Sequence, residues 1–398
     1  MAPKNRFALL WANVALAAFV LVAVFNFVID PYGLRVPRWQ GINELKHRPN
    51  RVIDDIKLAS ALRQEANALI LGNSRADIGF DPRHAGMRQS ALRPFNLAVP
   101  GSGLETAVRQ LETLLAVGVS PRLVVVGIDF MDFLNDKPSA AASKVDRMQD
   151  WQGRELHLNL ESLFTLTALD ESIATLQAQH AAYPATIRVD GFNPMRDYIG
   201  LARTDGYPAL FRQRGLENAR RLKAAKYPGD VRSVSTYAAM EQLLVLARAR
   251  NIRMELAIYP YHAQFISLFR LYGLLPAFER WKMTLSEAVG QAAADGAPVR
   301  LWDFAVLDDR SAEAIPARSD LKADTVWYWE AGHFKSALGG LVLDRMLMDA
   351  NPSRPGFGRL LAPGHSVEVV NLDQRLSGLL LKRRDLAQDL AEIERAVR

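Results

Sequence analysis

Residues 68–82 read ALILGNSRADIGFDP, and this stretch decides the expected fold. Its apolar beginning is typical of a buried strand in a parallel sheet. The strand breaks off at Gly72, which permits a tight turn, and Ser74 follows at once. Because ligands of open parallel sheets bind beyond the carboxyl ends of the strands, Ser74 is predicted to present its hydroxyl in a crevice. The alternative is that Ser74 merely caps the helix that follows.

Working outward from this stretch, short β-branched runs alternate with helical patterns along most of the chain. The predicted strands are 67–72, 94–99, 122–129, 253–259 and 298–304. Apolar positions spaced by three and four predict helices near 52–65, 103–117, 158–180, 235–250, 264–293 and 335–349. Such alternation is typical of a parallel sheet covered by helices. The expected fold class is therefore α/β, a three-layer arrangement around a parallel five-stranded sheet.

The spacing of the strands also predicts the domain organisation. More than a hundred residues separate the third and fourth strands, which exceeds an ordinary crossover, so residues 136–235 are expected to form a helical insertion. The α/β domain is placed at 52–350 and a C-terminal extension at 351–398. From Leu372 onward, apolar positions keep four-three spacing, broken at Arg383. This pattern fits a short coiled coil or, with so few heptads, an amphipathic helix lying on its own domain.

The N-terminus carries the signal for location. Residues 7–29 form a run of 23 residues without a charge, and a helix of that length covers roughly 34 Å, enough to cross a bilayer core. No small-residue cleavage site precedes Asp30, so residues 1–30 are predicted to be an uncleaved transmembrane anchor, followed by a polar linker at 31–51. The alternative is a buried core helix. Basic residues lie on both sides of the run, so charge does not settle its orientation.

Composition excludes several classes of function. The 398-residue chain is 49% hydrophobic, which supports a large core. Its formal charge of +6 is spread without a dense basic tract, which argues against nucleic-acid binding. The absence of cysteine excludes disulfides, thiolate metal sites and a cysteine nucleophile. The seven histidines show no complete zinc set, so neither a metal nor another cofactor is expected.

A partner for Ser74 lies near the far end of the predicted domain. Residues 327–334 read WYWEAGHF, with Glu330 three residues before His333. His333 is a candidate acceptor of the serine proton, and Glu330 a candidate to hold the imidazole in the required tautomer. Asp303 and Asp324 are rival acids for the same histidine. A purely structural histidine is the alternative interpretation.

Together these blocks resemble the SGNH hydrolase-like superfamily, especially membrane-anchored bacterial members associated with exopolysaccharide or cell-wall acylation. The resemblance covers most of residues 66–345. Its blocks are GNSR at 72–75, FNLAVPGS at 95–102, GID at 127–129 and EAGH at 330–333. The resemblance implies that Ser74 is the nucleophile, with an oxyanion hole built from Ser74, Gly101 and Asn96.

The third block departs from the family pattern, because Asp129 stands where the superfamily usually has asparagine. An ionised Asp129 cannot donate to an oxyanion. Either Asn96 or Asn135 replaces that donor, or backbone amides suffice, or the site is inactive. Asp129 is also expected to contact substrate together with Tyr261 and His262, although a packed strand end explains those two equally well.

Arg75 and Asp77, which flank the serine, are expected to form a solvated pair in the first turn of the next helix.

The resemblance implies a membrane-anchored serine acyl esterase or O-acyltransferase that acts on a bacterial extracytoplasmic polysaccharide. The expected location is the bacterial inner membrane, with a single span and a periplasmic domain beside a membrane acyl-transfer partner. The alternative is a non-catalytic polysaccharide-binding or assembly scaffold with the same fold. A third interpretation is a cytoplasmic enzyme whose N-terminal helix is buried.

Overall fold

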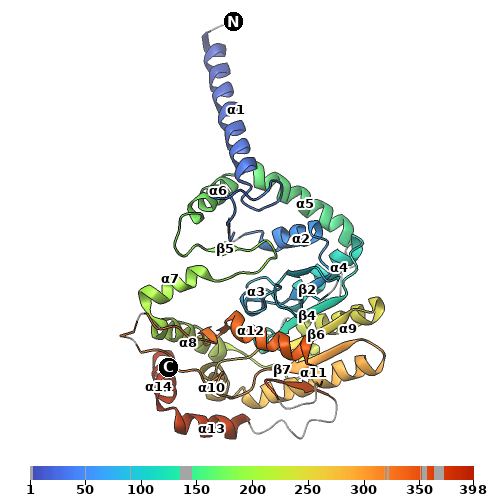
Figure 1. Ribbon diagram of the computed structural model, residues 1–398, viewed down its shortest axis with the longest axis vertical. Coiled ribbons are helices and arrows are strands. Elements are labelled where there is room, and N and C mark those ends of the chain that lie inside the picture. Colours follow the sequence, from blue (N-terminus) through green and yellow to red (C-terminus); the bar gives the residue numbers. More distant parts are fainter. Residues whose placement is uncertain are drawn as a thin grey trace.

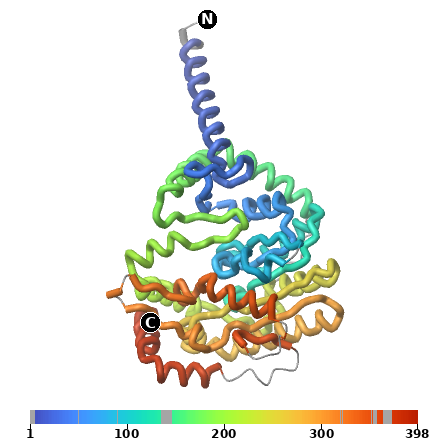
Figure 2. The backbone as a smooth tube through the Cα atoms, in the orientation of Figure 1, coloured from blue at the N-terminus to red at the C-terminus, as the bar shows by residue number. Residues whose placement is uncertain are grey.

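The computed structural model describes residues 3–49, 51–89, 91–134, 146–317, 319–320, 322–349, 351, 356–362 and 372–398. The fold is α/β, with a body from which one helix, α1 (Pro3–Ile29), projects at the N-terminal end (Figure 1). The tube drawing shows the C-terminal helices at the opposite end of the body from α1 (Figure 2).

A six-stranded sheet forms the centre of the body. Its strands are β2 (Ala68–Leu71), β3 (Pro94–Asn96), β4 (Leu123–Ile128), β6 (Arg253–Ile258), β7 (Val299–Asp303) and β10 (Arg359–Leu361). The order is β10-β7-β6-β4-β2-β3, with β10 antiparallel to its neighbour and the other pairs parallel. All five predicted strands are confirmed. The edge strand β10 was not predicted, because three residues carry too little pattern.

The strand order explains why the site forms where it does. After β2 the chain moves outward to β3, then returns past β2 to β4 and continues in the other direction. The crevice between β2 and β4 is therefore the topological switch point, where the loops after the two strands part to opposite faces. Ser74 and Asp129 directly follow these two strands.

Helices cover both faces of the sheet. Successive side chains of a strand point to opposite faces. Asp303 of β7 binds Lys282 of α11 (Leu275–Ala294) at 2.9 Å. Its neighbour Trp302 lies against Arg345, just after α12 (Ser336–Leu343), with the guanidinium 5.8 Å from the ring centroid. The helices α11 and α12 therefore lie on opposite faces.

The predicted helices form, but two of them are broken. The short helices match closely: α2 (Ile53–Arg63), α4 (Leu104–Ala116) and α9 (Ser235–Arg250). The predicted helix at 158–180 is instead α5 (Arg147–Phe164) and α6 (Leu166–Ala178), because the Thr165 hydroxyl caps a new helix by accepting from the Ala168 amide. The predicted helix at 264–293 is α10 (Ala263–Leu271) followed by α11, with Gly273 at φ +70° between them.

The described part of the segment between β4 and β6, residues 129–134 and 146–252, is mostly helical. Besides α5 and α6 it contains β5 (Thr186–Ile187), α7 (Arg196–Asp205) and α8 (Tyr207–Ala224). The strand β5 pairs with β1 (Lys46–His47), so the segment expected to be a polar linker is folded against the body. Tyr32, Asn43 and Lys46 in that segment are buried, which a loose linker does not achieve.

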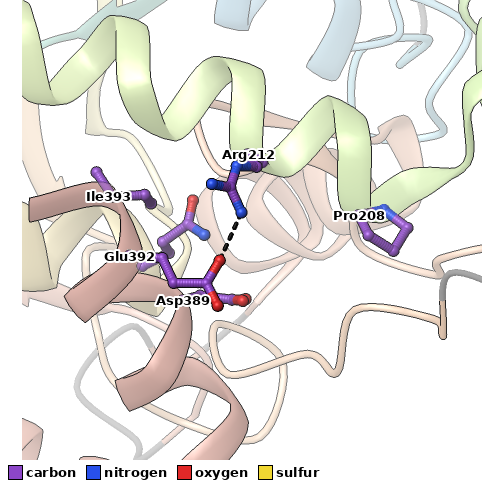
Figure 3. A pocket seen from close by; sticks show the side chains of 6 residues that line it. Pro208, Arg212, Asp389, Glu392 and Ile393 are labelled. Atoms are coloured by element: carbon purple, nitrogen blue, oxygen red, sulfur yellow. Dashed lines mark hydrogen bonds and ion pairs between the residues drawn. The ribbon is translucent and has the colours of Figure 1, made fainter. Parts of the chain in front are cut away.

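The C-terminal extension forms two helices, α13 (Leu372–Lys382) and α14 (Arg384–Val397). They meet at Arg383, the position where the apolar spacing is broken. The helix α14 contacts α8 and α10, as an amphipathic helix lying on its own domain does. Figure 3 shows this junction, where Arg212 of α8 binds Glu392 of α14 beside Ile393.

The N-terminal helix α1 is long and apolar enough to cross a membrane, and its apolar window is not buried. This exposure argues against the buried core helix and is consistent with an anchor or a signal sequence. At its base Asn26 donates to the Leu163 carbonyl of α5 at 3.0 Å and accepts from Ser172 of α6 at 2.9 Å. The end of α1 is therefore fixed to the body (Figure 1).

Candidate active site

The turn after β2 leaves Ser74 partly exposed and does not use its hydroxyl to cap the next helix. Gly72 has φ +139°, a conformation that favours glycine. Asn73, rather than Ser74, caps α3 (Ser74–Gly79), because its side chain accepts from the Arg75 amide at 3.0 Å. In the fully described stretch from Ala68 to Phe80, every residue except Ser74 is buried. The buried strand thus ends by offering one partly exposed hydroxyl.

The structure brings Ser74, His333 and Glu330 together. The Ser74 Oγ lies 2.8 Å from the His333 Nε2, although 259 positions separate the two residues. His333 begins β9 (His333–Phe334), which pairs with β8 (Tyr328–Glu330) in a tight hairpin. The Nδ1 of His333 contacts the Glu330 carboxylate. When the Nδ1–H of the ring donates to Glu330, Nε2 is left as the acceptor for the serine hydroxyl.

Close backbone packing holds the hairpin against the serine turn. A Cβ atom at Gly79, the last residue of α3, would lie 2.0 Å from the Phe334 ring. Gly339 of α12 approaches the same turn, since a Cβ there would lie 1.8 Å from the Gly79 carbonyl oxygen. Phe334 also packs against Phe80, with ring centroids 5.4 Å apart. These contacts place the residue next to Phe334, which is His333, over the end of β2.

Glu330 is held as a carboxylate by its surroundings. The side chain is 1% exposed, and it accepts from the Gly332 amide at 2.6 Å and lies 3.2 Å from the Arg214 Nε of α8. Burial by itself raises the pKa of Glu330, but His333, Arg214 and the Gly332 amide outweigh it and hold the pKa below its ordinary value. A buried anion behind the imidazole is what stabilises an imidazolium formed during proton transfer.

The rival acids have other partners. Asp303 binds Lys282 at 2.9 Å and Arg359 at 3.0 Å. Asp324 binds Lys335 at 2.6 Å. The geometry therefore assigns Glu330, among the three acids considered, to His333.

Asp129 forms a second carboxylate cluster behind the serine turn. It is 2% exposed and accepts from Asn73 at 2.9 Å and from the Tyr261 hydroxyl at 2.7 Å, and it contacts the Arg75 guanidinium. The Met131 amide donates to it at 3.1 Å. Burial disfavours the charged form of Arg75, but Asp129 raises its pKa above the ordinary value. The negative charge of Asp129 is thus paired with a permanent cation.

The amides available for an oxyanion are those of Ser74 and Gly101. Val99 donates its amide to the Gly72 carbonyl at 3.0 Å, so the loop that carries Gly101 lies beside the serine turn. Gly101 has φ +73°. Within the described residues, neither the Ser74 amide nor the Gly101 amide donates to a protein acceptor. Two such donors beside a nucleophile suit a developing oxyanion.

The expectation that Asn96 supplies a third donor does not fit its contacts. Its amide nitrogen donates to the Ala76 carbonyl at 2.8 Å and the Phe80 carbonyl at 2.9 Å, and the side chain is fully buried. Both hydrogens are therefore used to tie the serine turn to β3. Asn135, the other candidate donor, lies outside the described residues.

The expected substrate contacts of Asp129, Tyr261 and His262 are replaced by internal ones. Tyr261 is 1% exposed, and its hydroxyl donates to Asp129 and accepts from the Phe130 amide. His262, also 1% exposed, caps α10 by accepting from the Gln264 amide, and its other ring nitrogen lies 3.1 Å from the Glu313 carbonyl. Burial lowers the pKa of His262 to about 4. All three are structural here.

The expectation of a solvated Arg75 and Asp77 pair is wrong. Asp77 is 1% exposed and binds the buried Lys57 of α2 at 2.5 Å. Arg75 is 8% exposed and belongs to the Asp129 cluster. Sequence reasoning also missed Arg214, which lies in the insertion more than a hundred positions from Glu330. No local spacing signals any of these three pairings.

Within the described parts of the chain, no group of three or more histidine, cysteine, aspartate or glutamate side chains is placed to hold a metal ion. Comparison of the sequence with known proteins gives no matching family model and no matching curated relative.

Proposed function

We propose that the protein is a serine-dependent acyl esterase or O-acyltransferase. One observation carries the proposal: the Ser74 Oγ lies 2.8 Å from the His333 Nε2, and a buried glutamate contacts the other nitrogen of the same ring. This is the arrangement in which a histidine activates a serine and a carboxylate orients the histidine.

The residues define the steps of an acyl transfer. Ser74 Oγ attacks the acyl carbonyl carbon while His333 Nε2 takes the hydroxyl proton. The amides of Ser74 and Gly101 donate to the resulting oxyanion. The carbon–oxygen bond to the leaving alcohol then breaks, and His333 returns the proton to that alcohol. Water or a sugar hydroxyl then attacks the acyl-serine and gives its proton to His333. The bond between the acyl carbon and Ser74 Oγ breaks, and His333 returns the proton to Ser74.

The substrate class we propose is an acylated polysaccharide outside the bacterial inner membrane. The exposed apolar helix α1 supports this proposal, because an anchor keeps the domain near a polymer that is being exported. The resemblance of the four sequence blocks to membrane-anchored SGNH hydrolase-like proteins supports it as well. The same resemblance supports a membrane acyl-transfer partner. The hydroxyl of Ser74 is partly exposed and can therefore reach the carbonyl carbon of such an ester.

A non-catalytic scaffold is the second candidate, and Asp129 is the observation that favours it. A free carboxylate beside the serine opposes an oxyanion. That argument is weakened by Arg75, which contacts Asp129 and offsets its charge.

The test uses the full chain in neutral detergent, an aryl acetate substrate and a fluorophosphonate probe. The wild type is expected to hydrolyse the ester and to be labelled at Ser74. Ser74→Ala is expected to lose at least about a thousand-fold in kcat and all labelling. Ser377→Ala, in which a hydroxyl of α13 is removed, is the matched control and retains both. A folded wild type with neither turnover nor labelling favours the scaffold.

A further inference from the structure

A second site lies beside the end of α1, lined mainly by residues 31–64 and 187–191. It is a cavity of about 330 Å³, here called the basic cavity. Its lining residues include Gly33, Arg38, Lys46, Arg63 and Arg188, and none of the residues that line it is an aspartate or glutamate. Of these cations, Arg188 already binds Asp81 and Asp190, which lie outside the lining. A concave site with cations and no acid in its lining is suited to an anionic ligand.

Three of the cations converge on Gly33. A Cβ atom at Gly33 would lie 3.6 Å from the Lys46 Cε and 4.0 Å from an Arg38 guanidinium nitrogen. Arg63 donates to the Gly33 carbonyl at 3.3 Å. The three positive groups come from the loop after α1, from β1 and from α2, so the fold, rather than local sequence, brings them together.

These three cations have backbone partners rather than carboxylates. Arg38 donates to the Glu44 carbonyl at 2.8 Å, and Arg63 to the Leu34 carbonyl at 2.8 Å. Lys46 donates to the carbonyls of Ile29 and Asp30 at the end of α1. Within the described residues, no carboxylate lies within 4.0 Å of any of the three charged groups. Carbonyl dipoles orient a cation but do not neutralise it.

The acid that attracts all three cations is Asp30, which directly follows α1. Asp30 uses its carboxylate to accept from the amides of Leu34, Arg35 and Val36 at 2.7 to 3.1 Å. Lys46 is 2% exposed, and burial lowers its pKa to about 8 despite the attraction of Asp30. Asp30 attracts all three cations, but within the described residues it forms no ion pair with any of them.

Two other cavities formed by described residues differ in this respect. The cavity of about 200 Å³ between α8 and α14 has Asp389 and Glu392 beside Arg212 (Figure 3). The cavity beside Arg310 is lined by Glu279 and Asp308 as well. In both, acids and bases are mixed. The basic cavity is set apart by the absence of acids from its lining.

We propose that the basic cavity binds a phosphate group carried by a small molecule or by a lipid headgroup. Guanidinium and ammonium groups that converge from several sides are the donors that phosphate oxygens require. Lys46 binds the last carbonyls of α1, so the cavity lies directly beside the end of the apolar helix. A phospholipid headgroup and a free phosphate are therefore the two sources of the same chemistry. The proposal does not depend on the chemistry of Ser74.

The test is titration calorimetry of the full chain in dodecyl maltoside, with two probes at constant ionic strength. The probes are inorganic phosphate and dihexanoyl phosphatidylglycerol. Saturable binding of the lipid alone indicates a headgroup site, and comparable binding of both probes indicates a site for free phosphate. If neither probe binds saturably, the proposal is overturned.

Variants connect any binding to the cavity. Arg38→Gln and Arg63→Gln are each expected to weaken binding about tenfold, as loss of one charge-assisted contact does. Arg232→Gln, far along the chain in a 3-10 turn and paired with Glu287, is the matched control and is expected to bind as the wild type does. Thermal unfolding of each variant checks its fold. Because the Arg38 side chain is exposed, Arg38→Gln remains decisive even if Arg63→Gln unfolds. Equal binding by Arg38→Gln and the wild type also overturns the proposal.

Discussion

Two buried carboxylates flank the serine turn, and they differ in the basic side chain that each one contacts most closely. Glu330 is 1% exposed and contacts His333. Asp129 is 2% exposed and contacts Arg75. Both accept a backbone amide as well, and both lie where the chain leaves a strand. Each carboxylate also lies beside an arginine, so the two clusters are similar, and the imidazole that contacts Glu330 is the difference.

The partner decides what each cluster can do. An imidazole gains and loses a proton near neutral pH, whereas a guanidinium in a protein does not. Glu330 can therefore stabilise a charge that appears only during the reaction. Asp129 is paired permanently, and it ties Asn73 and Arg75 to the end of β4. A proton relay and a fixed structural support are thus built from similar buried carboxylates that differ in their neighbouring base.

The largest effect is expected from Glu330→Gln. A glutamine amide can donate to His333 Nδ1, which moves the ring proton to Nε2 and removes the acceptor for Ser74. We expect kcat for an aryl acetate to fall by about a thousand-fold to ten-thousand-fold, with little change in KM. Asp324→Asn is the matched control, because Asp324 binds Lys335 instead of the histidine. A large loss in Asp324→Asn without one in Glu330→Gln contradicts the assigned roles.

Asp129→Asn is expected to act mainly on stability. Removing this charge leaves the buried Arg75 unpaired, which costs about 3 kcal/mol of unfolding free energy. Chemical denaturation measures the loss. The kcat of the folded fraction is expected to fall less than in Glu330→Gln.

The double variant Asp129→Asn with Arg75→Gln sharpens this comparison. It removes both charges, so it is expected to recover part of the lost stability. Arg75→Gln alone is measured as well. If the losses of unfolding free energy in the two single variants simply add in the double variant, the two residues do not act as a pair.

The sheet and the relay were predictable for different reasons. The central strands β2 and β4 are continuous apolar runs, which is what burial on both faces requires, whereas β3, β6 and β7 also contain polar or charged residues. Ser74 follows such a run directly, and Glu330 and His333 are three positions apart, so each half of the relay has a local signature. Their meeting followed from the rule that sites lie beyond the carboxyl ends of parallel strands.

The supporting contacts were not predictable, because they depend on partners far apart in the sequence. Tyr261 reaches Asp129 across 132 positions, and Lys57 reaches Asp77 across 20. A charged residue in a first helical turn is usually solvated, and nothing in the sequence near Arg75 or Asp77 shows that both are buried. Whether a polar side chain serves the chemistry or the core is decided by burial, which periodicity does not reveal for single residues.

A smaller effect is expected on the unfolding free energy at low pH, because of His262. Its pKa is lowered to about 4 in the folded protein by burial, whereas an unfolded histidine titrates near 6.5. As pH falls below about 6.5 the unfolded chain takes up a proton that the folded chain refuses, so stability falls with pH. This residue alone is expected to cost about 2 kcal/mol between pH 7 and pH 5.

The measurement is the unfolding free energy of the wild type and of His262→Gln at both pH values. The variant is expected to be less stable at pH 7, because the cap of α10 changes, and to lose less stability on acidification. An equal pH dependence in both proteins would contradict the assignment.

The smallest effect is expected from Arg214→Gln, which removes a partner of Glu330 from outside the relay. The Arg214 side chain is 36% exposed, so solvent screens its charge, and a loss of about threefold to tenfold in kcat is expected. Arg214 helps to hold the pKa of Glu330 low. Without it, that pKa rises, and the acid limb of the pH–rate profile is expected to move to higher pH. Arg214→Lys should restore part of the profile.

Arg212→Gln is the matched control for Arg214→Gln, since Arg212 lies on the same helix but binds Glu392 of α14 (Figure 3). It is expected to leave both kcat and the pH profile unchanged. If Arg214→Gln lowers kcat but the acid limb stays in place, Arg214 acts through the packing of α8 against β8. A shifted limb in Arg214→Gln alone, by contrast, places the effect on the charge of Glu330 and makes the relay depend on the insertion.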